Sequence, residues 1–134
     1  MKLSEVMGFD VVGFAYPGGG VNCDARVERL VRERTGVRYA RTVGVSGSFE
    51  RPKDLYCFQM TASACCDWER TEALAREFVE MQTDEPKIFS LYGHGYELDI
   101  EDTWDRFERL CAFLSGREDI FYGTNREVLL DEWQ

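Results

Sequence analysis

The sequence contains one histidine, three prolines and comparatively few basic residues. Lysine and arginine together number 16, against 25 aspartates and glutamates, so the net charge is −9 at pH 7. A field of this sign repels nucleic acids and anionic lipid surfaces, and no cluster of basic residues opposes it. The composition therefore predicts that nucleic acid is not a partner of this chain.

Long hydrophobic runs are also missing. None approaches the roughly 20 residues of a membrane-spanning helix, and no charged leader with an apolar run precedes the first predicted strand. We therefore expect no membrane association and no signal peptide. The 134 residues are enough for one domain, 1–134, that buries a core without disulfides.

The five cysteines are odd in number and include no C-x-x-C pair. They are Cys23, Cys57, Cys65, Cys66 and Cys111. With a single histidine, no zinc-binding spacing can be recognised. We expect small buried or half-buried thiols in a reducing, cytoplasmic setting.

Strand-like and helix-like segments alternate along the chain. Strands are predicted at 11–15, 39–43, 55–60, 87–92 and 119–122. Helices are expected after Asp24, after Asp67, and after Asp99 or Asp102, and Thr124 with Glu127 forms a capping box before a last short helix. This alternation predicts an α/β fold with a parallel sheet and crossover helices.

In parallel sheets, ligands bind in the loops that follow the carboxyl ends of the strands. Three loops fit that description: 18–22, 61–66 and 93–99. The first follows a strand and precedes a helix, as a phosphate site does, but its glycines are contiguous and Asp24 would repel an anion. A tight turn with glycines at positive φ is the favoured interpretation.

The loop after the fourth strand contains the sole histidine, His94, between Gly93 and Gly95. Tyr96, Glu97 and Asp99 follow it closely. An imidazole near carboxylates is suited to general acid/base chemistry near neutral pH. A lone histidine is more often a surface or capping residue, but the position at the carboxyl end of a strand makes the two interpretations about equal. If Cys65 or Cys66 lay close to His94, the two side chains would form a nucleophilic pair. The stronger alternative is that these cysteines are inert thiols.

Taken together, three segments resemble a known family. The segments are "VVGFAYPGGGVNCD", "VRYARTVGVSGSFERPKDL" and "KIFSLYGHGYELD", the last of which continues to "REDIFYGTNREV". They are similar to the later part of polysaccharide deacetylases, the NodB-homology family of carbohydrate esterases. The resemblance implies part of an irregular (β/α) barrel. It also implies removal of N-acetyl groups from sugars by a divalent metal held by an Asp-His-His triad.

The chain departs from the family pattern at several points. The T-F-D-D-G and H-x-x-x-H motifs are missing, so we expect no metal in this chain, and a zinc-like divalent ion only in a full-length member. Ala15 and Gly18 stand where the family has Arg and Tyr. What the resemblance retains is a catalytic role for His94, an oxyanion contact from the Gly18 N–H, and a substrate-binding set: Tyr16, Pro17, Gly18, Gly19, Tyr96 and Glu97.

The function implied is that of a deacetylase-like hydrolase acting on acyl groups of carbohydrates, inactive alone because the metal motifs are missing. The alternatives are a non-catalytic carbohydrate-binding or interaction domain and a small thiol-dependent α/β enzyme. We further expect His94 to lie within reach of the Gly18 loop. A barrel without its first strands leaves the strand at 11–15 as an exposed edge, which predicts a homo-oligomer.

Overall fold

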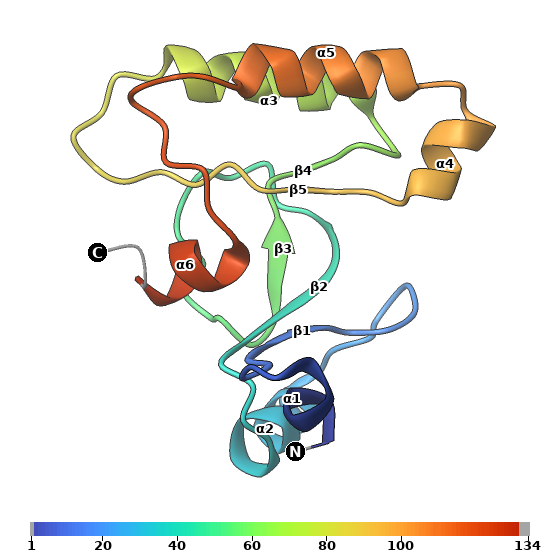
Figure 1. Ribbon diagram of the computed structural model, residues 1–134, viewed down its shortest axis with the longest axis vertical. Helices are drawn as coiled ribbons and strands as arrows, with labels where there is room; N and C mark the ends of the chain where they lie inside the picture. Colours follow the sequence, from blue (N-terminus) through green and yellow to red (C-terminus); the bar gives the residue numbers. More distant parts are fainter. Residues whose placement is uncertain (1, 132–134) are drawn as a thin grey trace. The chain divides into compact units, whose positions relative to one another are not determined.

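The computed structural model describes residues 2–131. Six helices and five strands lie in this part of the chain (Figure 1). In order they are α1 (Lys2–Met7), β1 (Gly13–Ala15), α2 (Ala25–Arg34), β2 (Tyr39–Val45), β3 (Phe58–Met60), β4 (Ala62–Ser63), α3 (Trp68–Glu80), β5 (Leu91–Tyr92), α4 (Gly95–Ile100), α5 (Trp104–Leu114) and α6 (Asn125–Leu130).

The chain divides into two compact units. The first comprises the described residues up to 43, residues 52–59 and those from 123 onward, and the second comprises 44–51 and 60–122. The single domain expected over residues 1–134 stays a prediction. The two units are described separately below.

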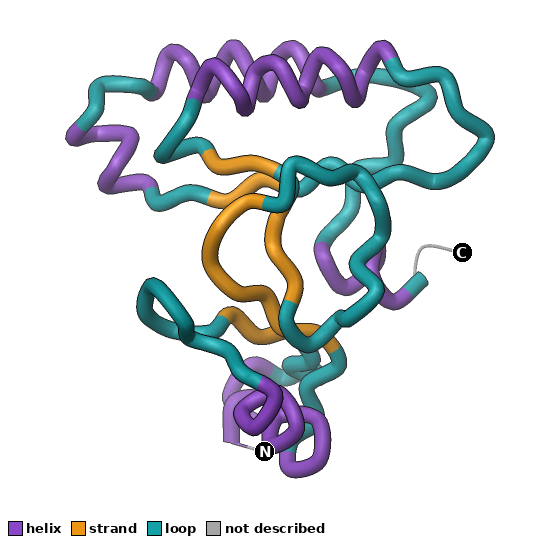
Figure 2. Tube along the Cα trace, turned by 180° about the vertical axis from the view of Figure 1, so that it is seen from behind, coloured by secondary structure: helices purple, strands orange, loops and turns teal. Residues whose placement is uncertain are grey.

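The second unit has a continuous apolar core. Helices α3 and α5 lie side by side, and α3 also packs on β4 (Figures 1 and 2). The buried residues form two clusters: Ala64, Trp68, Ala75, Leu98 and Leu110 in one, and Phe49, Ala62 and Leu74 in the other. Phe89 and Leu91 pack against both clusters, so the β5 segment is held by apolar contact with each.

Strands β4 and β5 pair in parallel, with Ala62 opposite Leu91 and Ser63 opposite Tyr92. Partly buried polar contacts fix this pairing. The Thr61 backbone N–H donates to the Ser90 hydroxyl at 3.0 Å, and the Ser90 N–H donates to the Thr61 hydroxyl at 3.1 Å. The carboxyl ends of both strands therefore lie next to each other.

The first unit contains β1, which pairs in parallel with β2, and Gly13 lies opposite Tyr39. The sheet order is β1-β2-β3, so β1 is an edge strand. Helix α2 buries none of its residues. An open groove of about 450 Å³ borders β1 and includes Phe9, Phe14 and Tyr39 in its lining. An exposed edge of this kind is what the expected self-association requires, and that association stays a prediction.

Several local predictions are confirmed. Asp24 caps α2 by accepting from the N–H groups of Arg26 and Val27, and Asp67 caps α3 by accepting from the N–H of Arg70. The capping box of Thr124 and Glu127 is present at α6. Parallel pairing is confirmed for β1 with β2 and for β4 with β5. The structure is thus α/β, and the barrel stays a prediction.

The strand predicted at 119–122 is wrong. The Tyr122 hydroxyl donates to the Leu114 carbonyl at 2.6 Å and accepts from the Arg117 N–H at 3.0 Å. These bonds fold the segment back on the end of α5 as a turn. The side chains of Phe121 and Tyr122 are exposed, so the apolar pattern that suggested a strand does not mark burial.

The strand predicted at 87–92 is limited to Leu91 and Tyr92. The preceding residues form no strand; the Ile88 N–H donates to the Phe49 carbonyl of a loop at 2.8 Å. Helix α4 was not predicted, because Gly93 and Gly95 indicate a turn. The helix predicted after Asp99 or Asp102 begins later, with Thr103 at its N-cap.

The expectation of free thiols is wrong for two of the five cysteines. Cys23 and Cys57 form a disulfide within the first unit, with Cα atoms 6.5 Å apart. Cys65, Cys66 and Cys111 are free. Since disulfides form mainly in oxidising compartments, this bond does not favour the reducing setting expected, and the compartment stays a prediction. Among residues 2–131, no helix combines the length and apolar character needed to cross a bilayer.

Candidate functional site

The candidate site lies where β4 and β5 end. The Ala64 N–H donates to the Tyr92 carbonyl at 2.8 Å, which extends the parallel pairing by one residue. Cys65 follows Ala64, and His94 follows Tyr92 after one glycine. Two loops that were predicted as ligand-binding therefore meet at one edge, as expected for parallel strands.

Gly93 permits the close approach of these loops. A Cβ placed at this residue would lie 2.9 Å from the Cys65 sulfur and 3.1 Å from the Ala64 Cβ. Both distances are shorter than ordinary van der Waals contacts, so any larger residue would push the two loops apart. The glycine thus brings the His94 backbone N–H to 3.1 Å from the Cys65 Sγ, to which it donates.

His94 is held by a carboxylate one helical turn away. Its Nδ1 lies 2.8 Å from Oε2 of Glu97, in the first turn of α4. Hydrogen bonds from Cys65 and from His94 lower the pKa of the Glu97 carboxyl below its usual range. Because an ionised carboxylate only accepts hydrogen bonds, we assign the proton of this bond to Nδ1 of the imidazole.

Cys65 completes the cluster. Burial raises the pKa of its thiol above the usual range, and a hydrogen bond to Glu97 raises it further. Its resting form is therefore the neutral thiol, which donates to the carboxylate. The sulfur, an imidazole nitrogen and a carboxylate oxygen all lie within 4.8 Å of one another.

The sequence predicted His94 and Glu97 as site residues. It gave Cys65 only as one of two cysteines that could pair with His94. It did not predict the cluster of Cys65, His94 and Glu97, because a metal site was expected only from the family motifs that this chain lacks. A partial signal was present: Cys65 and His94 lie in the loops 61–66 and 93–99, which follow two strands that were both predicted to belong to a parallel sheet. Glu97 three residues after His94 then falls on the same face of a helical turn.

Tyr96 lies beside the histidine. The two ring centroids are 5.4 Å apart, with the planes tilted by 33°. The Tyr96 side chain is exposed, and the His94 side chain is 53% exposed. An exposed aromatic ring therefore lies next to an accessible imidazole.

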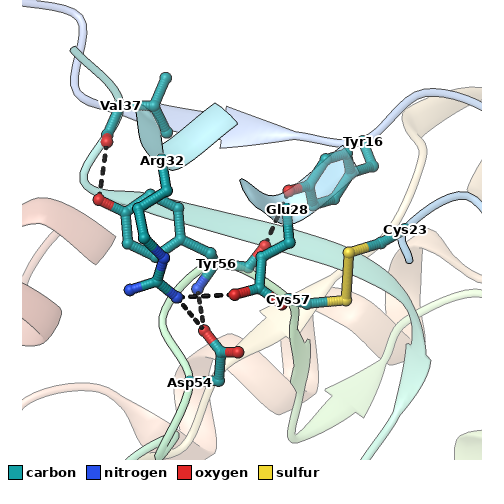
Figure 3. Close-up of polar contacts among 8 residues, drawn as sticks. All are labelled: Tyr16, Cys23, Glu28, Arg32, Val37, Asp54, Tyr56 and Cys57. Atoms are coloured by element: carbon teal, nitrogen blue, oxygen red, sulfur yellow. Dashed lines mark hydrogen bonds and ion pairs between the residues drawn. A yellow bond between two sulfur atoms is a disulfide. The ribbon is translucent and has the colours of Figure 1, made fainter. Parts of the chain in front are cut away.

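The other predicted substrate contacts belong to the first unit. Tyr16 is buried, and its hydroxyl donates to the Tyr56 carbonyl at 2.9 Å (Figure 3). Burial raises the pKa of this phenol, and the nearby Glu28 carboxylate raises it further. The Tyr16 hydroxyl thus has an internal partner, and its contact with substrate stays a prediction.

Pro17, Gly18 and Gly19 are exposed in the loop that follows β1. Gly18 has φ of +80°, so the predicted glycine turn is confirmed. The Asn22 amide closes the turn by donating to the carbonyls of Tyr16 and Gly18, each at 3.1 Å. The loop and His94 belong to different units, so their proximity stays a prediction.

The charged residues near Tyr16 pair with one another: Arg32 contacts both Glu28 and Asp54 (Figure 3). Arg32 pairs with Glu28 at 2.7 Å and lies 4.1 Å from the centroid of the Tyr56 ring. The Tyr56 hydroxyl donates to the Val37 carbonyl at 3.1 Å. These contacts, with the Cys23–Cys57 disulfide, hold α2 to the loop before β3.

Comparisons with protein-family models, with curated proteins and with solved structures found no match to this chain. The resemblance to polysaccharide deacetylases therefore enters the functional argument as a hypothesis, and the geometry around His94 has to support it.

Proposed function

We propose that this chain is a deacetylase-like hydrolase portion that acts on acyl groups of carbohydrates and contributes His94 as the group that transfers the proton. One observation carries the proposal: the 2.8 Å bond between His94 Nδ1 and the Glu97 carboxylate, at the joined ends of two parallel strands. This is the arrangement in which a carboxylate orients an imidazole for acid/base work.

The hydrogen bond to Glu97 determines which nitrogen of the His94 ring is available for proton transfer. With the proton on Nδ1, the neutral ring has an unprotonated Nε2 that can accept a proton and later return it. Among residues 2–131 no hydrogen bond to Nε2 is found, and the ring is half exposed. In amide hydrolysis, a protonated Nε2 would give its proton to the departing sugar amine as the C–N bond breaks, while water supplies the hydroxyl of the released acid.

Tyr96 supports the carbohydrate part of the proposal. Its side chain is 60% exposed, and its ring lies next to the imidazole that would act on the acyl group. The irregular barrel belongs to the same proposal, and the parallel pairs β1–β2 and β4–β5 support it. The missing Asp-His-His motifs lead us to expect no acetate release from this chain alone.

A titration followed by NMR tests the proposal. A short β-linked N-acetylglucosamine oligomer is expected to shift the ring resonances of His94 and Tyr96, and its de-N-acetylated counterpart to shift them less. Tyr96→Phe should retain this response, and Tyr96→Ala should weaken it about tenfold, since the aromatic face is lost. No shift at His94 with either oligomer would contradict the proposal.

The thiol-dependent alternative is favoured by one observation, the closeness of Cys65 to His94. The raised pKa of the Cys65 thiol argues against it, because the thiolate is the nucleophile. Alkylation by iodoacetamide distinguishes the two proposals. We expect Cys66, which is exposed, to react faster than Cys65 at neutral pH. Faster reaction at Cys65, abolished by His94→Asn, would favour the thiol enzyme.

A further inference from the structure

We propose that Cys65, His94 and Glu97 form a binding site for one divalent transition-metal ion of the zinc class. The three residues bring a sulfur, an imidazole nitrogen and a carboxylate oxygen within 4.8 Å of one another. This inference goes beyond the proposed function and does not rest on it, because the proton transfer by His94 is proposed for the metal-free chain. It also replaces the sequence-based expectation that the chain lacks a metal-binding set.

The donor atoms define the class of ion. Zinc and its neighbours accept thiolate, imidazole and carboxylate together, whereas calcium and magnesium require oxygen ligands. Bonds of about 2.0–2.3 Å place tetrahedral zinc ligands roughly 3–4 Å apart. The donor atoms of the cluster lie within 4.8 Å of one another, so shifts of roughly 1 Å bring them to that spacing.

The backbone places the ligands before any ion arrives. Cys65 follows β4, His94 follows β5, and the parallel pairing holds these strand ends together. Gly93 keeps the two loops in contact, and the hydrogen bond from the His94 N–H fixes the sulfur beside the imidazole. A site with this degree of preorganisation loses little conformational entropy on binding an ion.

Three protein ligands leave a fourth position on a tetrahedral ion, which is the pattern of zinc sites that bind water or substrate. The exposure of His94 and Glu97 gives the ion a route from solvent, since their side chains are 53% and 33% exposed. When the sulfur becomes a ligand, the thiol loses its proton to solvent. The neutral imidazole binds through Nδ1 and carries its proton on Nε2 instead.

Titration with cobalt(II) alone tests the site, because cobalt substitutes for zinc and reports its ligands by absorption. We expect one ion per chain, a thiolate-to-cobalt charge-transfer band in the near ultraviolet, and visible bands of tetrahedral intensity. Zinc should displace the cobalt. Cys65→Ser should remove the charge-transfer band, and Glu97→Gln should weaken binding at least tenfold.

The chain offers matched controls in Cys66→Ser and Cys111→Ser, which should leave the cobalt spectrum unchanged. Far-ultraviolet circular dichroism of each variant confirms that it folds. Absence of a charge-transfer band in the folded wild-type chain, or a band that survives Cys65→Ser, would overturn the site. These readouts use no sugar and no hydrolysis, so their failure is distinguishable from failure of the proposed function.

Discussion

The two units of this chain are stabilised by different means. In the second unit, buried apolar side chains from α3, α5 and the β4 and β5 segments form a core. In the first unit, α2 buries no residue, whereas Leu3, Val6 and Phe9 are more than half exposed and a disulfide joins two segments. The candidate site lies on the second unit, where packing can hold three side chains in a fixed arrangement.

The largest expected effect comes from the core of the second unit. Leu110 in α5 is 4% exposed, and Leu110→Ala should lower the free energy of unfolding by about 2–5 kcal/mol, because it leaves a cavity. The matched change Leu30→Ala in α2, where the side chain is 45% exposed, should cost less than about 1 kcal/mol. If denaturant unfolding shows equal losses of unfolding free energy in the two variants, the two units are not stabilised in different ways.

The next effect concerns the disulfide. The double variant Cys23→Ser/Cys57→Ser should lose about 2–4 kcal/mol of stability in the first unit, since the cross-link closes a loop between cysteines 34 residues apart. Hydrogen exchange should become faster in α2 and stay unchanged in α3. If α3 amides exchange faster to the same degree, the two units do not differ in the way described.

A smaller loss is expected at the last helix. Thr124 accepts from the Glu127 N–H, and the Glu127 carboxylate accepts from the Thr124 N–H at 2.7 Å. Thr124→Ala should cost about 0.5–2 kcal/mol, whereas Thr124→Ser retains the hydroxyl and should cost little. Thermal unfolding of both variants checks this, and an equal loss from serine would show that the methyl group matters instead.

The smallest effect is the ion pair between α3 and α5. Arg106 donates to Glu72 at 2.8 Å, and this bond lowers the pKa of the Glu72 carboxyl below its ordinary value of 4.5. The pair therefore adds stability above the unfolded-state pKa, and this contribution is lost as the pH falls through the lowered native value. Because both side chains are partly exposed, solvent screens the pair and its contribution is small.

A comparison of the unfolding free energies of Glu72→Gln and wild type from pH 7 to pH 2 measures the contribution of the ion pair. The difference in unfolding free energy should start to shrink near the ordinary pKa of 4.5 and should reach zero only below the lowered native pKa, where wild-type Glu72 is protonated in the folded state as well. A difference that is constant across this range would mean that the charge contributes nothing.

Local signals in the sequence were sufficient where a few neighbouring residues decide the structure. Asp24, Asp67 and the Thr124–Glu127 box start helices where predicted, because capping depends on backbone groups two or three residues away. The segment at 119–122 was mistaken for a strand, because the Tyr122 bond to Leu114 is a contact eight residues back.

The site was predicted in part. His94 and Glu97 are three residues apart, so their pairing follows from the sequence once a helical turn is assumed. The addition of Cys65 depends on the pairing of β4 with β5 and on the space that Gly93 leaves, which are long-range features. The Cys23–Cys57 bond could not be predicted, since cysteine spacing alone does not determine connectivity.

The central claim is that Glu97 holds His94 with its proton on Nδ1 and its Nε2 available for proton transfer. A long-range proton–nitrogen spectrum of the metal-free chain, recorded with the imidazole neutral, measures this directly. We predict the Nδ1–H tautomer in the wild type and a loss of this preference in Glu97→Gln, while Asp99→Asn leaves it unchanged. An Nε2–H tautomer that Glu97→Gln does not alter would contradict the account.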